Sequence, residues 1–425
     1  MARDVAAHAY VAEEPRRVAK ALRRSLIALL VVVLLAAAGA GYQYFRSLPP
    51  ASASVILPRQ ANFPGARPSL PWPPLAAGSL AVEGVGSLGG QYSSEQRPLA
   101  SVTKLVTALV VLKQHPLAVG QSGPEITVSA SDAAAYRTDA AQRQSVVAVV
   151  PGERLSELEA LEAMLVPSAN NVARLLARWS AGSIPAFVAD MNAEAAALGL
   201  RHTHLVGPAG LNAGSVGTAA DMVRLGEAVL ANPVLAQIVQ MPQVTLPAAG
   251  TVYNYDYVLG HDGIIGIKTG STTSSGGNFV FAARRLLAGR SVTVVGAVLG
   301  VTGAQPLTSA LSAGEALVNA AFDSLKVATV LPRGRKVVVI KAKWGAQVVA
   351  GTSRAVSLFG FPGEPVRLSV APAPALASKK LAKLVAGERL ATVVVRAGGQ
   401  AVAVPVLAPG PVPAAPVKWR FERGL

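Results

Sequence analysis

The sequence predicts an α+β protein with an antiparallel sheet covered by helices on both faces, a small C-terminal all-β domain and an N-terminal transmembrane helix. Three observations predict this fold class. Strand-like runs occur before and after a central helical block in the first three quarters of the chain. After residue 327, short valine-rich runs are broken by glycine and proline, which is typical of a small β domain. Residues 25–45 carry no charge and are numerous enough to cross a bilayer.

The composition limits the class of protein before any motif is considered. At 425 residues the chain is long enough for two folded units. Although 51% of the residues are hydrophobic, only one apolar stretch is long enough to span a membrane, which excludes a polytopic membrane protein. The chain contains no cysteine, which excludes a disulfide framework, a thiolate metal site and a cysteine nucleophile.

The N-terminal region has the charge pattern of a single-pass protein whose first segment is cytoplasmic. Five basic residues and no acidic ones lie between Arg16 and Arg24, directly before the uncharged stretch. The positive-inside rule therefore places residues 1–24 in the cytoplasm, a signal anchor at 25–45 and the rest of the chain outside. Small residues around Ala38 leave a second interpretation open, in which a signal peptidase removes this segment and the protein is secreted.

A proline-rich segment at residues 46–75 follows the anchor. It contains eight prolines and shows little periodicity. This composition predicts an extended, semi-stiff spacer that lifts the next domain off the bilayer.

The first folded domain is predicted at residues 76–326. Ser156 and Glu159 have capping-box spacing at a helix start, and Gly199 marks a helix end. Gly89-Gly90 is interpreted as a turn. The expected elements are a strand at 79–85, helices at 101–112, 156–165, 171–179, 184–198 and 218–230, strands at 263–269, 278–284 and 291–299, and a helix at 309–325. Runs at 336–340, 366–370, 391–395 and 401–406 are expected to be strands of a second domain at 327–425.

Ser101 and Lys104 form a Ser-x-x-Lys pattern at the start of an expected helix. Residues three apart on a helix lie on one face, so the pattern places a hydroxyl beside an amine. The flanking residues are apolar, namely Leu99, Val102, Leu105 and Val106. Burial among them would lower the pKa of the lysine enough for its amine to accept the serine proton. A helix start with a solvated lysine gives the same pattern, so the interpretation depends on further motifs.

Two further motifs follow, Ser168-Ala169-Asn170 and Lys268-Thr269-Gly270. Ser-x-x-Lys, Ser-x-Asn and Lys-Thr-Gly each occur once in the chain and in this order. They fall in a helix start, an interhelical loop and a strand. Together the three patterns are typical of β-lactamases and penicillin-binding proteins.

Residues 76–326 resemble the serine D-alanyl-D-alanine carboxypeptidases, the low-molecular-mass penicillin-binding proteins. The similarity extends to blocks at residues 98–104, 168–171, 191–200, 207–211 and 266–272. It implies the transpeptidase fold shared by penicillin-binding proteins and β-lactamases, with no cofactor and no metal. The region after residue 327 is similar to that family's C-terminal domain only in its placement. The tail at residues 417–425 is too short for the amphipathic membrane anchor that some members carry.

The resemblance also implies the roles of the motif residues. Ser101 attacks the carbonyl of a D-Ala-D-Ala bond, Lys104 accepts its proton and Ser168 relays a proton to the leaving D-alanine. Backbone N–H groups of Ser101 and Ser271 form an oxyanion hole. The residues that would bind the substrate are Asn170, which positions the peptide, and Lys268, Thr269, Gly270, Ser271 and Thr272.

The implied partners are peptidoglycan stem peptides ending in D-Ala-D-Ala, with β-lactam antibiotics as covalent inhibitors. From residue 329 to 425 there are 15 lysines and arginines against three glutamates. For an extracytoplasmic domain this charge fits anionic lipids or cell-wall polymers as partners rather than nucleic acid, and a basic surface that only keeps the domain soluble is the open alternative.

Several alternatives stay open or are excluded at this stage. A DD-endopeptidase or transpeptidase would share the acyl-enzyme, and a non-catalytic penicillin- or peptidoglycan-binding protein would lack turnover. A class A β-lactamase is disfavoured because no Glu-x-x-x-Asn segment lies between Asn170 and Lys268. His202 and His204 are only a weak indication of a metal site, because no third ligand lies nearby. His261-Asp262 is a weak indication of a catalytic triad, because adjacent residues rarely orient one another. Trp179 and the run Asn254-Tyr255-Asp256-Tyr257 are interpreted as packing residues, with a place in the cleft as the alternative.

Overall fold

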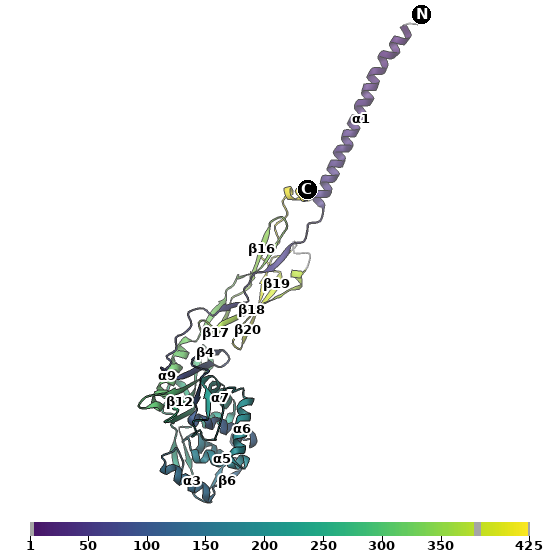
Figure 1. The fold of residues 1–425 in the computed structure, drawn as a ribbon. Coiled ribbons are helices and arrows are strands. Elements are labelled where there is room, and N and C mark those ends of the chain that lie inside the picture. Colours follow the sequence, from purple (N-terminus) through teal and green to yellow (C-terminus); the bar gives the residue numbers. More distant parts are fainter. Residues whose placement is uncertain (1–3, 378–383, 424–425) are drawn as a thin grey trace.

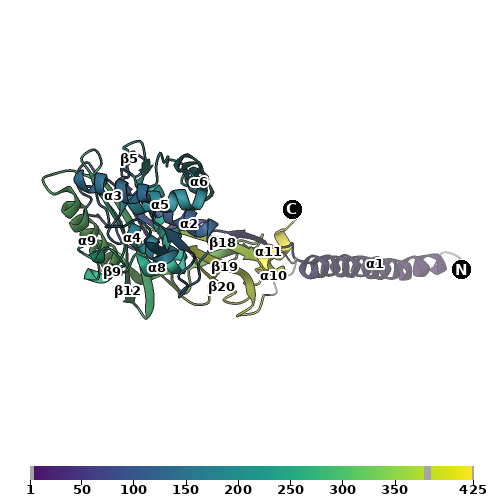
Figure 2. The same cartoon turned by 90° about the horizontal axis from the view of Figure 1, so that it is seen from below.

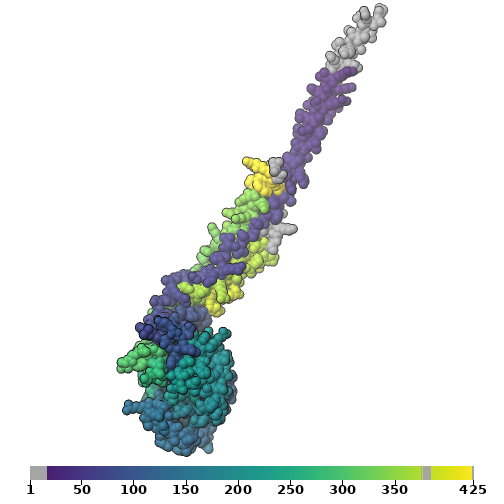
Figure 3. Space-filling view, in the orientation of Figure 1, coloured from purple at the N-terminus to yellow at the C-terminus, as the bar shows by residue number. Residues whose placement is uncertain are grey.

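A computed structural model describes residues 4–377 and 384–423, and the chain forms three parts in a row (Figure 1). A long helix, α1 (Asp4–Phe45), lies at one end. A β domain follows, and an α+β domain that contains the three motifs lies at the far end, as the turned view also shows (Figure 2). The space-filling view shows the same elongated shape, with purple N-terminal residues running beside yellow C-terminal ones in the β domain (Figure 3).

Helix α1 contains the predicted membrane span. Residues Arg17–Phe45 are apolar enough to cross a membrane and are not buried by the rest of the protein. At 1.5 Å per residue they reach about 44 Å, more than the roughly 30 Å hydrocarbon core of a bilayer. An apolar helix near the N-terminus fits either a membrane anchor or a signal sequence.

The proline-rich segment contributes two strands to the β domain, so the prediction of an extended spacer over residues 46–75 is wrong. β1 (Ser52–Val55) pairs with β15 (Lys336–Lys341), and β2 (Gln60–Asn62) pairs with β18 (Pro365–Pro372). Both strands lie at sheet edges, where the flanking prolines cost no ladder hydrogen bond. Further along, the ring of Trp72 packs directly over the backbone of Gly78.

The β domain is built on a seven-stranded antiparallel sheet in the order β1-β15-β16-β20-β19-β18-β2, beside a separate β14–β17 pair. The remaining elements are β14 (Lys326–Leu331), β16 (Gln347–Thr352), β17 (Val356–Gly360), β19 (Arg389–Ala397), β20 (Gln400–Leu407), α10 (Pro374–Ala377) and α11 (Val417–Glu422). Valine, leucine and alanine dominate its core. The predicted all-β domain is confirmed, although the sequence pattern missed β14, β16 and β17.

The α+β domain has a five-stranded antiparallel sheet in the order β11-β12-β13-β3-β4. The strands are β3 (Ala77–Val82), β4 (Gly86–Gln91), β11 (Ile264–Thr272), β12 (Gly276–Leu287) and β13 (Arg290–Val301). Alternate residues of β12 enter different cores: Phe279 and Phe281 pack with α9, whereas Val280 and Ala282 pack with the helices of the opposite face. An antiparallel sheet covered on both faces is therefore confirmed.

The helices of this domain form one cluster on the α7 side of the sheet and a single layer on the other. The cluster comprises α2 (Lys104–Gln114), α3 (Ala130–Ala141), α4 (Glu157–Leu165), α5 (Asn170–Ala181), α6 (Ile184–Ala197), α7 (Ala219–Ala231) and α8 (Pro233–Ile238), and α9 (Pro306–Ser324) covers the other face. Three short antiparallel pairs complete it: β5 (Gln96–Pro98) with β8 (Val216–Thr218), β6 (Glu125–Thr127) with β7 (Arg154–Ser156), and β9 (Gln243–Leu246) with β10 (Gly250–Tyr253).

The predicted turn at Gly89-Gly90 is wrong, because both glycines lie inside β4. The turn comes earlier, where Gly84 has a φ of +70°. Gly90 is a glycine because a Cβ there would lie 2.9 Å from the carbonyl oxygen of Gly78. The glycines of β4 therefore reflect the close approach of the β3 backbone and not a turn.

Candidate active site

Ser101 lies in a short 3-10 turn, Ala100–Thr103, that leads into α2. The preceding residue, Ala100, has a φ of +47°, a left-handed conformation that is strained for a residue with a side chain. Gly210 accommodates this turn, since a Cβ at that position would lie 1.8 Å from the carbonyl oxygen of Ala100. The predicted helix start therefore begins as a strained turn that displays the serine.

Lys104 is completely buried and joins two of the three motifs. Its Nζ donates to Ser101 Oγ at 2.8 Å, to Asn170 Oδ1 at 2.7 Å and to the carbonyl oxygen of Ala209 at 3.1 Å. Burial lowers the pKa of Lys104 well below its usual value, and the positive charges of Lys268 and Arg174 lower it further. Loss of a proton from Lys104 would leave an amine 2.8 Å from Ser101 Oγ, placed to accept the serine proton.

Ser168 lies in the loop between α4 and α5, as predicted, whereas Asn170, also predicted in that loop, is the first residue of α5. Ser168 is buried with a φ of +62°, and among the described residues its Oγ has no hydrogen-bond partner. A buried hydroxyl held without a partner in a strained loop is available to an incoming group. Asn170 Nδ2 donates to Gln144 Oε1 at 3.2 Å, which fixes the amide so that its oxygen faces Lys104.

Strand β11 brings the third motif beside the serine. Lys268 and Thr269 are buried in it. Gly270 faces the 3-10 turn so closely that a Cβ would lie 3.0 Å from the backbone nitrogen of Ser101. Asn278 of β12, which the sequence did not single out, donates from Nδ2 to the carbonyl oxygen of Pro98 at 2.9 Å and so ties the sheet to the segment before Ser101.

Asp256 is a buried carboxyl whose charge acts on Lys268, and the sequence did not assign it a role. Its side chain is buried, and burial raises the pKa of this carboxyl to about 6. Burial also lowers the pKa of Lys268 to about 8, and the opposing effect comes from the carboxylate of Asp256. Within the run Asn254-Tyr255-Asp256-Tyr257, which the sequence predicts to be packing residues, the Asp256 carboxylate therefore acts on the charge of Lys268. Only its burial identifies Asp256, and burial is not visible in the sequence.

The Asp256→Asn substitution is expected to shift the alkaline limb of the pH profile of kcat/KM to lower pH. If Lys268 holds a substrate carboxylate, as the resemblance implies, kcat/KM falls as pH rises through about 8, because the lysine then loses its charge. Loss of the Asp256 carboxylate removes the interaction that raises this pKa, so Lys268 loses its proton at lower pH. Asp262→Asn, which changes an exposed carboxylate near Arg285, is the control and should leave the limb in place. An unchanged alkaline limb in Asp256→Asn would show that the Asp256 carboxylate does not raise the pKa of Lys268.

The end of β11 opens into a groove of about 630 Å³. Ser271 and Thr272 line it, and Arg97 forms another part of its wall. Thr272 Oγ1 donates to Ser275 Oγ at 2.9 Å, so this hydroxyl is tied into the following turn. Ser271 is exposed at the rim.

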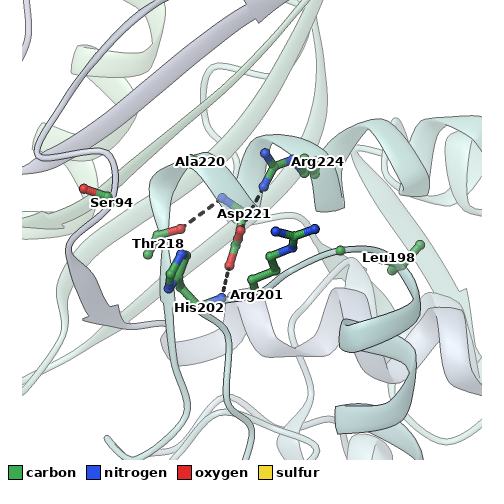
Figure 4. Close-up of a pocket in the computed structure, with 9 residues that line it drawn as sticks. Ser94, Leu198, Arg201, His202, Thr218, Ala220, Asp221 and Arg224 are labelled. Carbon is green, nitrogen blue, oxygen red and sulfur yellow. Dashed lines mark hydrogen bonds and ion pairs between the residues drawn. The ribbon is translucent and has the colours of Figure 1, made fainter.

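The other candidate residues lie apart from Ser101. His202 lines a different pocket of about 570 Å³, in which Asp221 accepts from the His202 backbone N–H and from Arg224 (Figure 4). His204 is part of an isolated bridge with Val216. His261 lies near Glu315 of α9, 3.7 Å from Nδ1 to Oε1, which does not fit a triad with Ser101.

The part of the chain that contains this site matches a known protein family. The family model described as D-alanyl-D-alanine carboxypeptidase matches residues 88–302, which include all three motifs. The chain belongs to this family. The resemblance inferred from the motifs is therefore confirmed.

Individual relatives carry more than one activity in their names. The D-alanyl-D-alanine carboxypeptidase DacB2 of Mycobacterium tuberculosis is 35% identical over 205 residues, 47% of this chain and 66% of that protein. A D-alanyl-D-alanine endopeptidase of Escherichia coli is 30% identical over 220 residues, 48% of this chain and 66% of that protein. The chain thus spans just under two thirds of the length of each of these relatives.

A solved structure also resembles the two-domain part of the chain. Penicillin binding protein 5 from Haemophilus influenzae matches with a TM-score of 0.56 and 20% identity, covering 83% of this chain and all of that one. At this identity the likeness shows the fold alone.

Proposed function

We propose that this protein is a serine-type D-alanyl-D-alanine carboxypeptidase that removes the terminal D-alanine from peptidoglycan stem pentapeptides. The observation that carries the proposal is the 2.8 Å contact between Ser101 Oγ and the buried Nζ of Lys104. A lysine with a pKa well below its usual value can be neutral near pH 7 and act as a base. Membership of the family supports this assignment of the substrate class.

Acylation begins when Ser101 Oγ attacks the carbonyl carbon of the penultimate D-alanine. The serine proton passes to Lys104 Nζ as the new C–O bond forms. Backbone N–H groups of Ser101 and Ser271 stabilise the negative oxygen, a contribution worth about 3 kcal/mol per donor. The closeness of Gly270 to the Ser101 nitrogen supports this placement, because it brings β11 against the serine backbone.

The leaving D-alanine then departs with a proton. The C–N bond breaks, the amine takes a proton relayed through Ser168 Oγ, and the electron pair of the C–N bond stays on nitrogen. Lys268, with Thr269, holds the terminal carboxylate, and Asn170 positions the peptide. Water hydrolyses the resulting ester, again with Lys104 as the base, and restores Ser101.

The specific reaction is tested with two substrates in parallel. The carboxypeptidase proposal predicts release of free D-alanine from a pentapeptide that ends in D-Ala-D-Ala. An endopeptidase, the activity named for the Escherichia coli relative, would instead cut cross-linked muropeptide dimers and release little D-alanine. A soluble form should begin before residue 52, because β1 belongs to the β domain. Turnover of the dimer alone, or acylation by penicillin without turnover of either substrate, would contradict the carboxypeptidase proposal.

We also propose that α1 is retained as a single-pass anchor with the α+β domain outside the cytoplasm. The length of the uncharged stretch supports retention, because residues 25–45 are enough to span a bilayer and exceed the apolar region of about 7–15 residues in a signal peptide. Intact mass of the protein purified from membranes tests this. A mature N-terminus after residue 38 would contradict it.

A further inference from the structure

The C-terminal segment of the chain meets the C-terminal end of α1, where the helix leaves its apolar span. Helix α11 lies beside the C-terminal end of α1, as the C-terminus label in Figure 1 and the turned view in Figure 2 both show. Gln43 Nε2 donates to the carbonyl oxygen of Arg423 at 2.8 Å, across 380 residues of sequence. The yellow C-terminal residues cover the base of the purple helix in Figure 3.

Arg423 provides α1 with a C-terminal cap. The last turn of a helix leaves carbonyl oxygens without intrahelical partners, and a cation there is favourable. The last turn of α1 contains no basic residue of its own. The Arg423 guanidinium donates to the carbonyl oxygens of Gln43, Arg46 and Ser47 instead.

Aromatic side chains connect α11 both to the end of α1 and to the β domain. The Arg420 guanidinium donates to the carbonyl oxygen of Tyr44 and lies over the Tyr44 ring, 5.0 Å from its centroid. The Trp419 ring packs edge-on against Trp344, with centroids 5.6 Å apart. Trp344 follows β15, and its Nε1 donates to the carbonyl oxygen of Pro413 at 2.8 Å. Here we call α11, the end of α1 and the β15–β16 turn the juxtamembrane clasp.

The clasp exposes positive charge beside its rings. Lys418 extends into solvent with 83% of its side chain exposed, and its pairing with Glu422 at 3.7 Å is loose. Lys343 is exposed next to Trp344, and Arg46 is exposed at the base of α1. Exposed aromatic side chains accompany them, including Phe421 and Tyr42. Aromatic rings and basic side chains at one level are typical of a surface that lies in the headgroup layer.

We propose that the juxtamembrane clasp binds the anionic phospholipid headgroups of the membrane that α1 spans. This proposal rests on the proposed retention of α1 as an anchor. Within the clasp, hydrogen bonds join the end of the anchor to α11, and the contact between Trp419 and Trp344 joins α11 to the β15–β16 turn. Headgroup binding would therefore orient the β domain on the membrane and hold the active site away from it.

The test measures tryptophan quenching in the full-length protein. Trp72 and Trp179 are changed to phenylalanine, which leaves Trp344 and Trp419 as the only tryptophans. The protein is reconstituted into vesicles of phosphatidylcholine, with or without about 30% phosphatidylglycerol, that carry a headgroup nitroxide. Quenching is expected to be at least about twofold stronger in the anionic vesicles and to weaken at about 0.5 M salt. The K343Q/K418Q variant should lose this difference, whereas R367Q/R396Q, which removes two charges from exposed positions on β18 and β19, should keep it.

The outcomes separate the clasp from the anchor. Flotation of the protein with vesicles is scored first, and its failure would overturn the anchor. If the protein floats, equal quenching in both vesicle types or an equal loss in both double variants would overturn headgroup binding. Retention by immobilised poly(glycerol phosphate) through Lys343 and Lys418, without lipid-dependent quenching, would overturn it in favour of an anionic polymer.

Discussion

Replacing Ser101 with alanine is expected to lower kcat/KM for D-alanine release by at least about 10⁴-fold. The substitution removes the atom that forms the acyl-enzyme, and loss of a nucleophile in comparable sites costs this much or more. Within the part of the chain that the structure describes, the only hydrogen bond of Ser101 Oγ is with Lys104 Nζ, so the fold should tolerate the change. Steady-state release of D-alanine from a pentapeptide, together with thermal unfolding of the variant, checks both parts.

Ser309→Ala provides the matched control, because it removes an exposed serine hydroxyl from α9. Its activity should stay within about twofold of wild type, as expected for a surface substitution. Residual activity of Ser101→Ala above about one per cent of wild type would exclude Ser101 as the sole nucleophile.

Replacing Lys104 with methionine is expected to lower the rate of acylation by about 10³-fold, within the range for loss of a general base. Methionine is of similar length and suits the buried site, but it cannot accept the proton of Ser101. It also leaves Asn170 Oδ1 and the carbonyl oxygen of Ala209 without the amine that donates to them. Each unsatisfied buried acceptor costs about 1–3 kcal/mol, so a lower melting temperature is also expected.

Stopped-flow measurement of acylation by a chromogenic β-lactam reports the chemical step directly. Lys113→Met is the control, because Lys113 lies on the same helix with 64% of its side chain exposed. If Lys104→Met acylates within tenfold of wild type while Lys113→Met is unchanged, another group accepts the serine proton.

Local signals in the sequence predicted the elements that hold the motifs. Ser156 and Glu159 form a reciprocal capping box at the start of α4, the helix that precedes the loop carrying Ser168. The predicted strands at 278–284 and 291–299 lie within β12 and β13. These predictions are correct because a helix cap and an alternating strand pattern depend only on residues that are close together in the sequence.

The features that the sequence missed depend on partners far along the chain. The prediction of a spacer at residues 46–75 is wrong because β1 and β2 are strands only through their pairing with β15 and β18, which lie far along the chain. Asp256 entered the site only through its burial near Lys268. The clasp joins Gln43 to Arg423, and no local pattern in either segment indicates the other. The roles of the motif residues stay predictions, since the geometry places them together without testing their chemistry.

Mapping the site of a penicillin adduct tests the central claim most directly. The full-length protein is treated with benzylpenicillin, digested, and its peptides are analysed by mass spectrometry. One penicilloyl group is expected on the peptide that contains Ser101, with none on the corresponding peptide of Ser101→Ala. An adduct on any other residue, or equal labelling of wild type and Ser101→Ala, would contradict the assignment of Ser101 as the acylated nucleophile.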